Sequence, residues 1–228
     1  DFVRTFVASL ATKRFVILTG LSGSGKTQIA LKFGQWLGKE HHEVIPVRPD
    51  WTGAEALFGY EDALSAAKDG RRGWSVPDAL RFMLKAADDT ANPYLLILDE
   101  MNLAHVERYF ADALSGMESD VETLPNLEKD DEDGTWRLKP DEPQKVKLPK
   151  NLFVVGTVNV DETTYMFSPK VLDRANTIEF RVKTDDLALT YKKPDRGETG
   201  PRELVRGFLQ VGRDPNWHID RLPDEIKE

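Results

Sequence analysis

The alternation of apolar and polar positions divides the chain into short strands and amphipathic helices. Continuous apolar runs predict buried strands at residues 15–18, 94–98 and 152–155, because a strand covered on both faces needs no polar side. Shorter runs predict two more strands at residues 43–47 and 177–180. Apolar positions three and four apart predict helices at residues 1–13, 28–38, 77–87, 101–117 and 201–209. This order is typical of an α/β domain with a central parallel sheet of five strands.

Two charged stretches interrupt the pattern. Residues 52–76 are rich in Gly and charge, and two interpretations stay open: a surface excursion with buried aromatics, or an insertion that faces a partner or a pore. Residues 118–150 are dense in Asp, Glu, Lys and Pro, which predicts a long charged loop or hairpin and the greatest tendency to disorder. We therefore expect one main domain that carries two insertions.

Length and composition set the outer limits. With 228 residues and 40% hydrophobic content, the chain can bury one sizeable core. No apolar run approaches the ~20 residues of a membrane span, so we expect a cytoplasmic protein with no membrane partner. The absence of cysteine excludes disulfides and thiolate metal sites. The net charge of −8 argues against a general nucleic-acid-binding surface. The chain starts at Asp1, and we expect it to be part of a longer protein.

A glycine-rich segment, GLSGSGKT, follows the first predicted strand and matches the phosphate-binding pattern G-x-x-x-x-G-K-[ST] in full. Glycines let the backbone turn with its N–H groups inward, and the next helix directs its positive dipole at an anion. Lys26 supplies a charge for the β- and γ-phosphates, and the Thr27 hydroxyl can ligate Mg²⁺. The residues expected at the nucleotide are Gly20, Ser22, Gly23, Ser24, Gly25, Lys26, Thr27 and Gln28.

The strand at residues 94–98 ends in two carboxylates, Asp99 and Glu100. In a nucleotide site the first acid holds Mg²⁺ and the second polarises the attacking water. An acidic pair after a strand is often only a helix cap, but the phosphate loop earlier in the chain favours the catalytic interpretation. Asn102 and His105 could approach this site, and for His105 we favour a solvated role. Glu100 as general base would distinguish a hydrolase from a binding protein.

Two more polar residues lie near predicted strands. Asn159 could hold the lytic water or contact the γ-phosphate, although an ordinary turn residue would look the same. Arg174 precedes the last strand, where an arginine is usually a surface ion-pair partner but could also reach a neighbouring subunit's nucleotide. His41 and His42 are adjacent in a polar connection, and we expect no metal there because adjacent residues do not converge on one ion without further ligands.

Four motifs in order carry a family resemblance. They are GLSGSGKT at residues 20–27, LILDEMN at residues 96–102, GTVN at residues 156–159 followed by VDE at 160–162, and SPKVLDR at residues 168–174. Together they resemble the AAA+ ATPase superfamily, and within it the McrB-type restriction motors, whose Walker B segments similarly contain DE-x-N. The resemblance covers about residues 15–181.

The resemblance implies a three-layer αβα P-loop NTPase core at residues 1–184, with insertions at about residues 52–76 and 118–150 that match those of the McrB-type clade. A linker and the start of a helical lid would occupy residues 185–228, where no sensor 2 arginine can be assigned and the lid is largely absent.

The resemblance also assigns site residues. Lys26 and Thr27 belong to Walker A, while Asp99 and Glu100 form Walker B. Asn159 would be sensor 1, and Arg174 would be an arginine finger that acts on the neighbouring subunit. The expected catalytic residues are Glu100, Asn159, Lys26 and Arg174, and the expected Mg²⁺ ligands are Thr27 and Asp99.

The implied function is Mg²⁺-dependent nucleoside triphosphate hydrolysis by a ring, usually a hexamer. Superfamily frequency favours ATP, while GTP stays open because McrB-type motors use it. We expect a McrB-like motor of a restriction or phage-defence system, with a separate nuclease partner and DNA contacted only indirectly or through another domain. The alternatives are a MoxR-like protein-remodelling ATPase and a nucleotide-gated assembly scaffold that does not hydrolyse.

Overall fold

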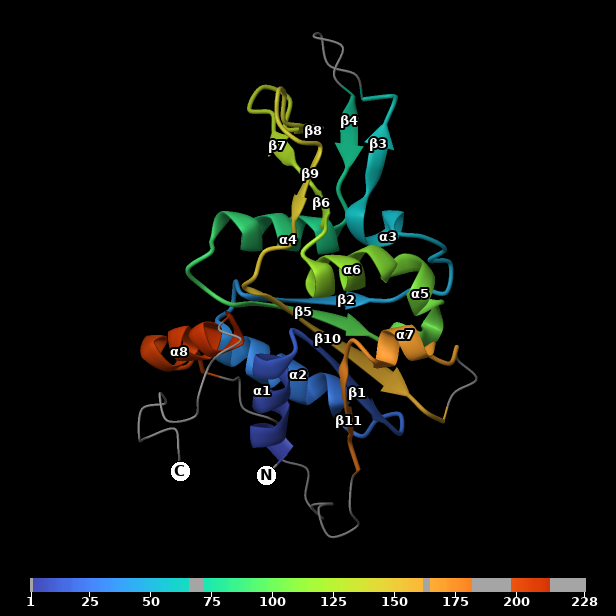
Figure 1. Ribbon diagram of the computed structural model, residues 1–228, viewed down its shortest axis with the longest axis vertical. Coiled ribbons are helices and arrows are strands. Elements are labelled where there is room, and N and C mark those ends of the chain that lie inside the picture. Colours follow the sequence, from blue (N-terminus) through green and yellow to red (C-terminus); the bar gives the residue numbers. More distant parts are fainter. Residues whose placement is uncertain (1, 66–71, 162–164, 182–197, 214–228) are drawn as a thin grey trace.

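The centre of the molecule is a parallel five-stranded sheet in the order β11, β1, β10, β5, β2 (Figure 1). The computed structural model describes residues 2–65, 72–161, 165–181 and 198–213. The strands of the sheet are β1 (Phe15–Gly20), β2 (His42–Pro46), β5 (Tyr94–Asp99), β10 (Leu152–Asn159) and β11 (Asn176–Glu179). All five lie where the apolar runs predict them, and the predicted α/β class is confirmed.

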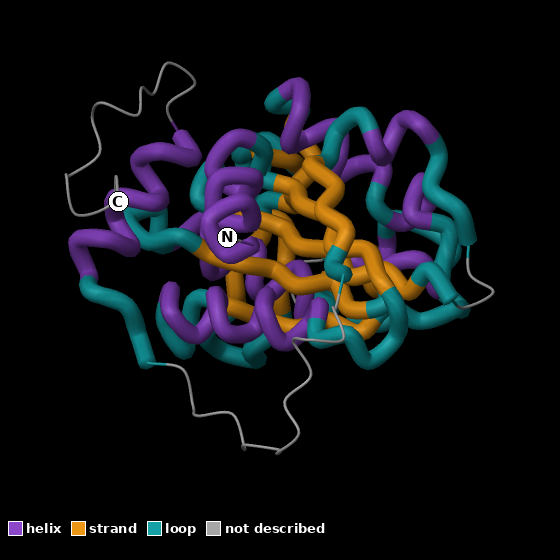
Figure 2. The backbone as a smooth tube through the Cα atoms, turned by 90° about the horizontal axis from the view of Figure 1, so that it is seen from below, coloured by secondary structure: helices purple, strands orange, loops and turns teal. Residues whose placement is uncertain are grey.

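Helices cover both faces of this sheet and enclose its strands (Figure 2). One layer holds α1 (Phe2–Thr12), α2 (Lys26–Leu37) and α8 (Arg202–Arg213). The other holds α3 (Glu55–Phe58), α4 (Asp78–Asp88), η1 (Met101–Leu103), α5 (Val106–Tyr109), α6 (Ala111–Ser119) and α7 (Pro169–Leu172). Strand residues alternate between the layers: on β10, Phe153 and Val155 pack with the first, and Leu152 and Val154 with the second.

The two insertions form one antiparallel sheet of four strands in the order β3, β4, β8, β7. Its strands are β3 (Tyr60–Asp62), β4 (Gly73–Ser75), β7 (Leu127–Lys129) and β8 (Trp136–Leu138), and Trp74 lies opposite Trp136. The pair β6 (Glu122–Pro125) and β9 (Lys145–Lys147) connects this arm to the core, from which it projects at the top of Figure 1. Residues 66–71 of the first insertion, including Arg71, lie outside the described residues.

The tendency to disorder expected of residues 118–150 is wrong, because the charges of this segment pair with one another. Arg137 is only 1% exposed, and its guanidinium pairs with Asp130 at 2.8 Å and with Asp133 at 2.6 Å. The hydrogen bond from Arg137 lowers the pKa of the Asp133 carboxyl well below its usual range.

The single helix expected at residues 101–117 is also wrong, since η1, α5 and α6 replace it. Ala104 and His105 have extended backbones, which ends η1 before α5 begins. The hydroxyl of Tyr109 donates to the Met101 carbonyl at 2.9 Å, and burial raises the pKa of this phenol so that it stays protonated. A side chain eight residues further along thus takes the place of a helical N–H, which periodicity does not reveal.

The helix α8 packs on α1 and the first layer through Val205, Phe208 and Leu209. Of the lid segment predicted at residues 185–228, the stretches 185–197 and 214–228 lie outside the described residues, so the domain boundary stays a prediction. Among the residues that the structure describes, no helix has both the length and the apolarity to cross a membrane.

Gly156→Ala is expected to lower the free energy of unfolding by about 1–3 kcal/mol, because the added methyl group would overlap the sulfur of the buried Met101. Gly207→Ala is the matched control, since a methyl group at this position of α8 meets open space. It should raise stability by about 0.5–1 kcal/mol through helix propensity. Denaturant unfolding of both variants checks the pair, and equal effects would contradict the close contact between β10 and η1.

Candidate functional site

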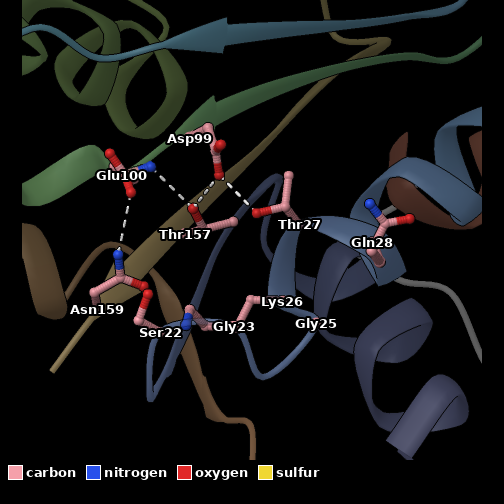
Figure 3. Close-up of a pocket in the computed structure, with 10 residues that line it drawn as sticks. All are labelled: Ser22, Gly23, Gly25, Lys26, Thr27, Gln28, Asp99, Glu100, Thr157 and Asn159. Atoms are coloured by element: carbon pink, nitrogen blue, oxygen red, sulfur yellow. Dashed lines mark hydrogen bonds between the residues drawn. The ribbon is translucent and has the colours of Figure 1, made fainter. Parts of the chain in front are cut away.

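A cavity of about 240 Å³ lies at the carboxyl ends of β1, β5 and β10 (Figure 3). Its lining residues are Ser22, Gly23, Gly25, Lys26, Thr27, Gln28, Asp99, Glu100, Thr157 and Asn159. Nine of the twelve site residues predicted from the sequence are among them. Gly20 and Ser24 belong to the same glycine-rich loop and contact the Lys26 ammonium. Asp161 contacts the backbone of Ser22, and Arg174 lines a different cavity.

The loop from Gly20 to Gly25 has a backbone that requires glycine. Gly25 precedes α2 with φ 101°, a left-handed conformation that other residues rarely adopt. A Cβ atom on Gly20 would lie 2.5 Å from the carbonyl oxygen of Phe180. These two glycines let the chain turn from β1 into α2, whose N-terminus begins at Lys26 beside the cavity.

Lys26 is almost fully buried, with 4% of its surface exposed. Its ammonium donates to the carbonyl oxygens of Gly20 at 3.0 Å and Leu21 at 2.5 Å, and to the Ser24 hydroxyl at 3.4 Å. These contacts curl the loop around the charge. An anion in the cavity would therefore meet a lysine whose position the loop already fixes.

Two hydroxyl groups converge on Asp99. Thr27 Oγ1 and Thr157 Oγ1 each donate to Asp99 Oδ1 at 2.7 Å. A threonine hydroxyl beside a carboxylate fits Mg²⁺, which prefers oxygen ligands and completes its shell with water and phosphate oxygens. The donor set present in the cavity thus agrees with the predicted ligands Thr27 and Asp99.

Glu100 has a left-handed backbone, with φ 54° and ψ 47°. Such a conformation costs about 1–3 kcal/mol in a residue other than glycine and persists only where the surroundings fix it. The Glu100 N–H donates to Thr157 Oγ1 at 3.0 Å, and its Oε1 accepts from Asn159 Nδ2 at 3.3 Å. The turn therefore aims the Glu100 carboxylate at Asn159, inside the cavity (Figure 3).

Two contacts at this site, those of Thr157 and Asp161, were not predicted from the sequence, and a third involves Asn102, which the sequence suggested could approach the site. Thr157 touches both acids, as described above. The Asp161 carboxylate accepts the Ser22 N–H, at 2.9 Å and 3.2 Å from its two oxygens. Asn102, 3% exposed, donates to the carbonyl oxygen of Asn159 at 3.2 Å. Strand alternation is the signal that could have identified Thr157, because residues two apart on β10 share a face. Glu162 of the resemblance motif lies outside the described residues.

Arg174 lies at the opposite edge of the sheet, beyond the end of α7. Its Nε pairs with Glu118 Oε2 at 2.5 Å, and it lines a second cavity of about 280 Å³. This cavity also contacts Phe15, the first residue of β1, whereas Gly20 at the other end of β1 leads into the phosphate loop. The chain's own Arg174 is therefore separated from its own nucleotide cavity by the length of a strand.

Lys13 fixes the backbone on either side of Arg174. Its ammonium donates to the carbonyl oxygens of Asp173 at 2.8 Å and Ala175 at 3.3 Å. The three histidines among the described residues lie outside the lining of the nucleotide cavity. Their ring contacts are His41 with the Leu37 carbonyl, His42 with the Gly38 carbonyl, and His105 against the ring of Tyr165. Within the described part of the chain, no group of three or more His, Asp or Glu is placed to hold a metal.

The sequence and the fold of this chain were compared with those of known proteins. No family model matches the chain. The crystal structure of a candidate ATPase from Cytophaga hutchinsonii aligns with a TM-score of 0.50 at 12% identity, covering 92% of this chain and 56% of that one. The chain is also 24% identical over 165 residues to the Type IV methyl-directed restriction enzyme EcoKMcrB subunit of Escherichia coli K12. The chain has the AAA+ fold and resembles McrB.

The McrB match covers 69% of this chain, which spans about a third (33%) of the relative's own length. Saccharomyces cerevisiae Hsp104 in complex with ADP aligns at a TM-score of 0.45 with 16% identity, covering 78% of this chain and 25% of that one, too weak to bear on the fold. The predicted resemblance to the AAA+ superfamily and to McrB-type motors is confirmed. The McrB-like chain has the fold of a P-loop NTPase, and the roles of individual residues stay predictions.

Proposed function

We propose that this McrB-like AAA+ chain hydrolyses a nucleoside triphosphate in a Mg²⁺-dependent reaction. The observation that carries the proposal is the convergence of a phosphate loop, a buried lysine and two acids in one cavity. Lys26 begins α2, whereas Asp99 and Glu100 follow one another at the end of β5, and all three line that cavity. A packed core alone does not need a lysine and two carboxylates at the ends of buried strands.

Each residue has a role in the proposed reaction. The loop N–H groups and Lys26 bind the phosphates, and Thr27 and Asp99 would hold Mg²⁺, which when bound offsets phosphate charge. Glu100 accepts a proton from the attacking water as the water oxygen bonds to the γ-phosphorus. The bond from that phosphorus to the β–γ bridging oxygen breaks, and its electron pair leaves with the nucleoside diphosphate. Asn159, which contacts Glu100, orients the water.

We propose further that Arg174 completes the site of a neighbouring copy in a ring, for which a hexamer is the expected size. Support comes from its place at the edge of the sheet opposite the phosphate loop. An arginine there can approach a nucleotide only across an interface between copies. Its guanidinium would offset charge on the transferring phosphoryl group.

The proposed biological role is a motor of a modification-dependent restriction or phage-defence system. It rests on the McrB match, since that relative is a subunit of a methyl-directed restriction enzyme. A separate nuclease subunit and DNA contact through another domain belong to the same proposal. We favour ATP as the nucleotide, with GTP as the alternative. The boundaries at residues 1–184 and 185–228 are proposed as core and start of lid.

Nucleotide binding tests the proposed role of Lys26 in holding the phosphates. Lys26→Met is expected to weaken binding of ATP or GTP about 10- to 100-fold in the presence of Mg²⁺, because charge-assisted hydrogen bonds to phosphate are lost. Lys39→Met, at an exposed position after α2, is the matched control and should bind as the wild type does. Titration calorimetry with each nucleotide measures both, and equal binding by both variants would contradict a role for Lys26.

A further inference from the structure

Thr157 is the residue through which the sheet contacts both acids of the cavity. It is 2% exposed on β10, and its hydroxyl makes two hydrogen bonds at once. The hydroxyl donates to Asp99 Oδ1 at 2.7 Å and accepts the Glu100 N–H at 3.0 Å (Figure 3). One hydroxyl has one proton and two lone pairs, so these two bonds are compatible.

The first bond holds Asp99 from the side of the sheet. The same oxygen, Oδ1, accepts the Thr27 hydroxyl from α2. Thr27 is itself a proposed cation ligand, whereas Thr157 is not a proposed ligand and contacts one, Asp99. Two donors on one carboxylate oxygen fix the side chain before a cation arrives, and an oriented ligand loses less conformational freedom on binding.

The second bond holds Glu100 in its left-handed turn. The Glu100 carbonyl accepts the Leu103 N–H at 2.9 Å, within the same turn. The Thr157 bond instead comes from a neighbouring strand, so it sets the turn relative to the sheet. Asn159 lies two residues further along β10 on the same face and contacts the Glu100 carboxylate. Two residues on the same face of β10 thus hold Glu100, Thr157 by its backbone N–H and Asn159 by its carboxylate.

We propose that Thr157 is a positioning residue, which orients Asp99 for Mg²⁺ and Glu100 for the attacking water through one hydroxyl group. The inference rests on the proposed Mg²⁺-dependent hydrolysis. A buried threonine that only satisfied its own hydroxyl would give stability without any effect on Mg²⁺. The two explanations therefore differ in a measurable way.

Thr157→Val tests the inference, because valine keeps the shape and removes both hydrogen bonds. Binding of a fluorescent ATP or GTP analogue is measured with Mg²⁺ and with EDTA, together with kcat. We expect the affinity gained from Mg²⁺ to fall about 10- to 100-fold and kcat to fall by a similar factor, while affinity in EDTA changes less than about twofold. Thr157→Ser keeps the hydroxyl and should restore both quantities to within about threefold of the wild type.

Thr123→Val is the matched control, because Thr123 is a buried threonine of β6 whose hydroxyl has no hydrogen-bond partner among the described residues. It should bind Mg²⁺ and nucleotide as the wild type does. Thermal unfolding is measured for every variant, and Thr157→Ala repeats the test if the valine variant does not fold.

An unchanged Mg²⁺ effect and unchanged kcat in folded Thr157→Val would overturn the inference alone, provided that the wild type gains affinity from Mg²⁺ and Glu100→Gln loses turnover. Loss of stability in Thr157→Val without any loss of the Mg²⁺ effect would have the same meaning. A wild-type chain without a Mg²⁺ effect and without turnover would instead overturn the proposed function.

Discussion

Glu100→Gln is expected to lower phosphate release about 10²- to 10⁴-fold while leaving nucleotide affinity within about twofold of the wild type. The amide keeps the size of the side chain and can still contact Asn159, which lies 3.3 Å from Glu100 Oε1. What it loses is the ability to accept a proton from water. Phosphate release and analogue binding, measured on the same samples, separate these two effects.

The control for this prediction is Glu43→Gln, an equivalent change at an exposed position of β2. It should retain full turnover. If Glu100→Gln also retained full turnover in a preparation that hydrolyses nucleotide, Glu100 would not be the general base. If the wild type bound nucleotide in a ring without any turnover, the assembly scaffold would be the better interpretation.

Arg174→Ala is expected to lower turnover about 10³-fold or more in the assembled ring, because a cation that offsets transition-state charge is removed. Nucleotide affinity should change far less, since Arg174 lies in the second cavity and not at the phosphate loop. Its partly exposed pair with Glu118 gives little stability, so the fold should persist. Phosphate release measures turnover, binding of a fluorescent nucleotide analogue measures affinity, and thermal unfolding measures stability, while light scattering checks that the ring is assembled.

Mixing two inactive variants tests whether Arg174 acts on a neighbouring copy. In a ring that contains both Arg174→Ala and Glu100→Gln subunits, some interfaces pair an intact Glu100 with an intact Arg174, and part of the turnover should return. Arg81→Ala, which removes another exposed ion pair, is the control and should keep full activity. If neither variant rescued the other in mixed rings, an action of Arg174 across the interface would be contradicted.

The sequence predicts those parts of the fold that depend on local pattern. The inner strands β1, β5 and β10 follow from continuous apolar runs, because strands buried on both faces need apolar residues throughout. The edge strands β2 and β11 are partly exposed and follow from shorter runs. The phosphate loop follows from the spacing of its glycines and Lys26, because backbone conformation dictates these residue types. The convergence of Asp99 and Asn159 on one cavity follows from both lying at the ends of parallel strands.

The remaining features depend on contacts between residues far apart in the chain. Trp74 and Trp136 belong to different insertions, and neither segment alone indicates that they share a sheet. The break between η1 and α5 is a different case, since the hydrogen bond from Tyr109 to Met101 spans only eight residues, but the apolar spacing of the segment fits one helix and does not reveal it. The contacts of Thr157 cannot be predicted from its own segment, because threonine is common in strands. They depend on the neighbouring strand β5, which ends at Asp99.

The most direct test of the central proposal is phosphate release from ATP and from GTP, with and without Mg²⁺, with the mass of the same samples measured by light scattering. We expect Mg²⁺-dependent release from a nucleotide-dependent oligomer. Selectivity for GTP would strengthen the McrB-like role, and selectivity for ATP would support a motor while weakening that narrower role. Absence of release with either nucleotide, from a chain that binds it and assembles, would contradict hydrolysis at this site.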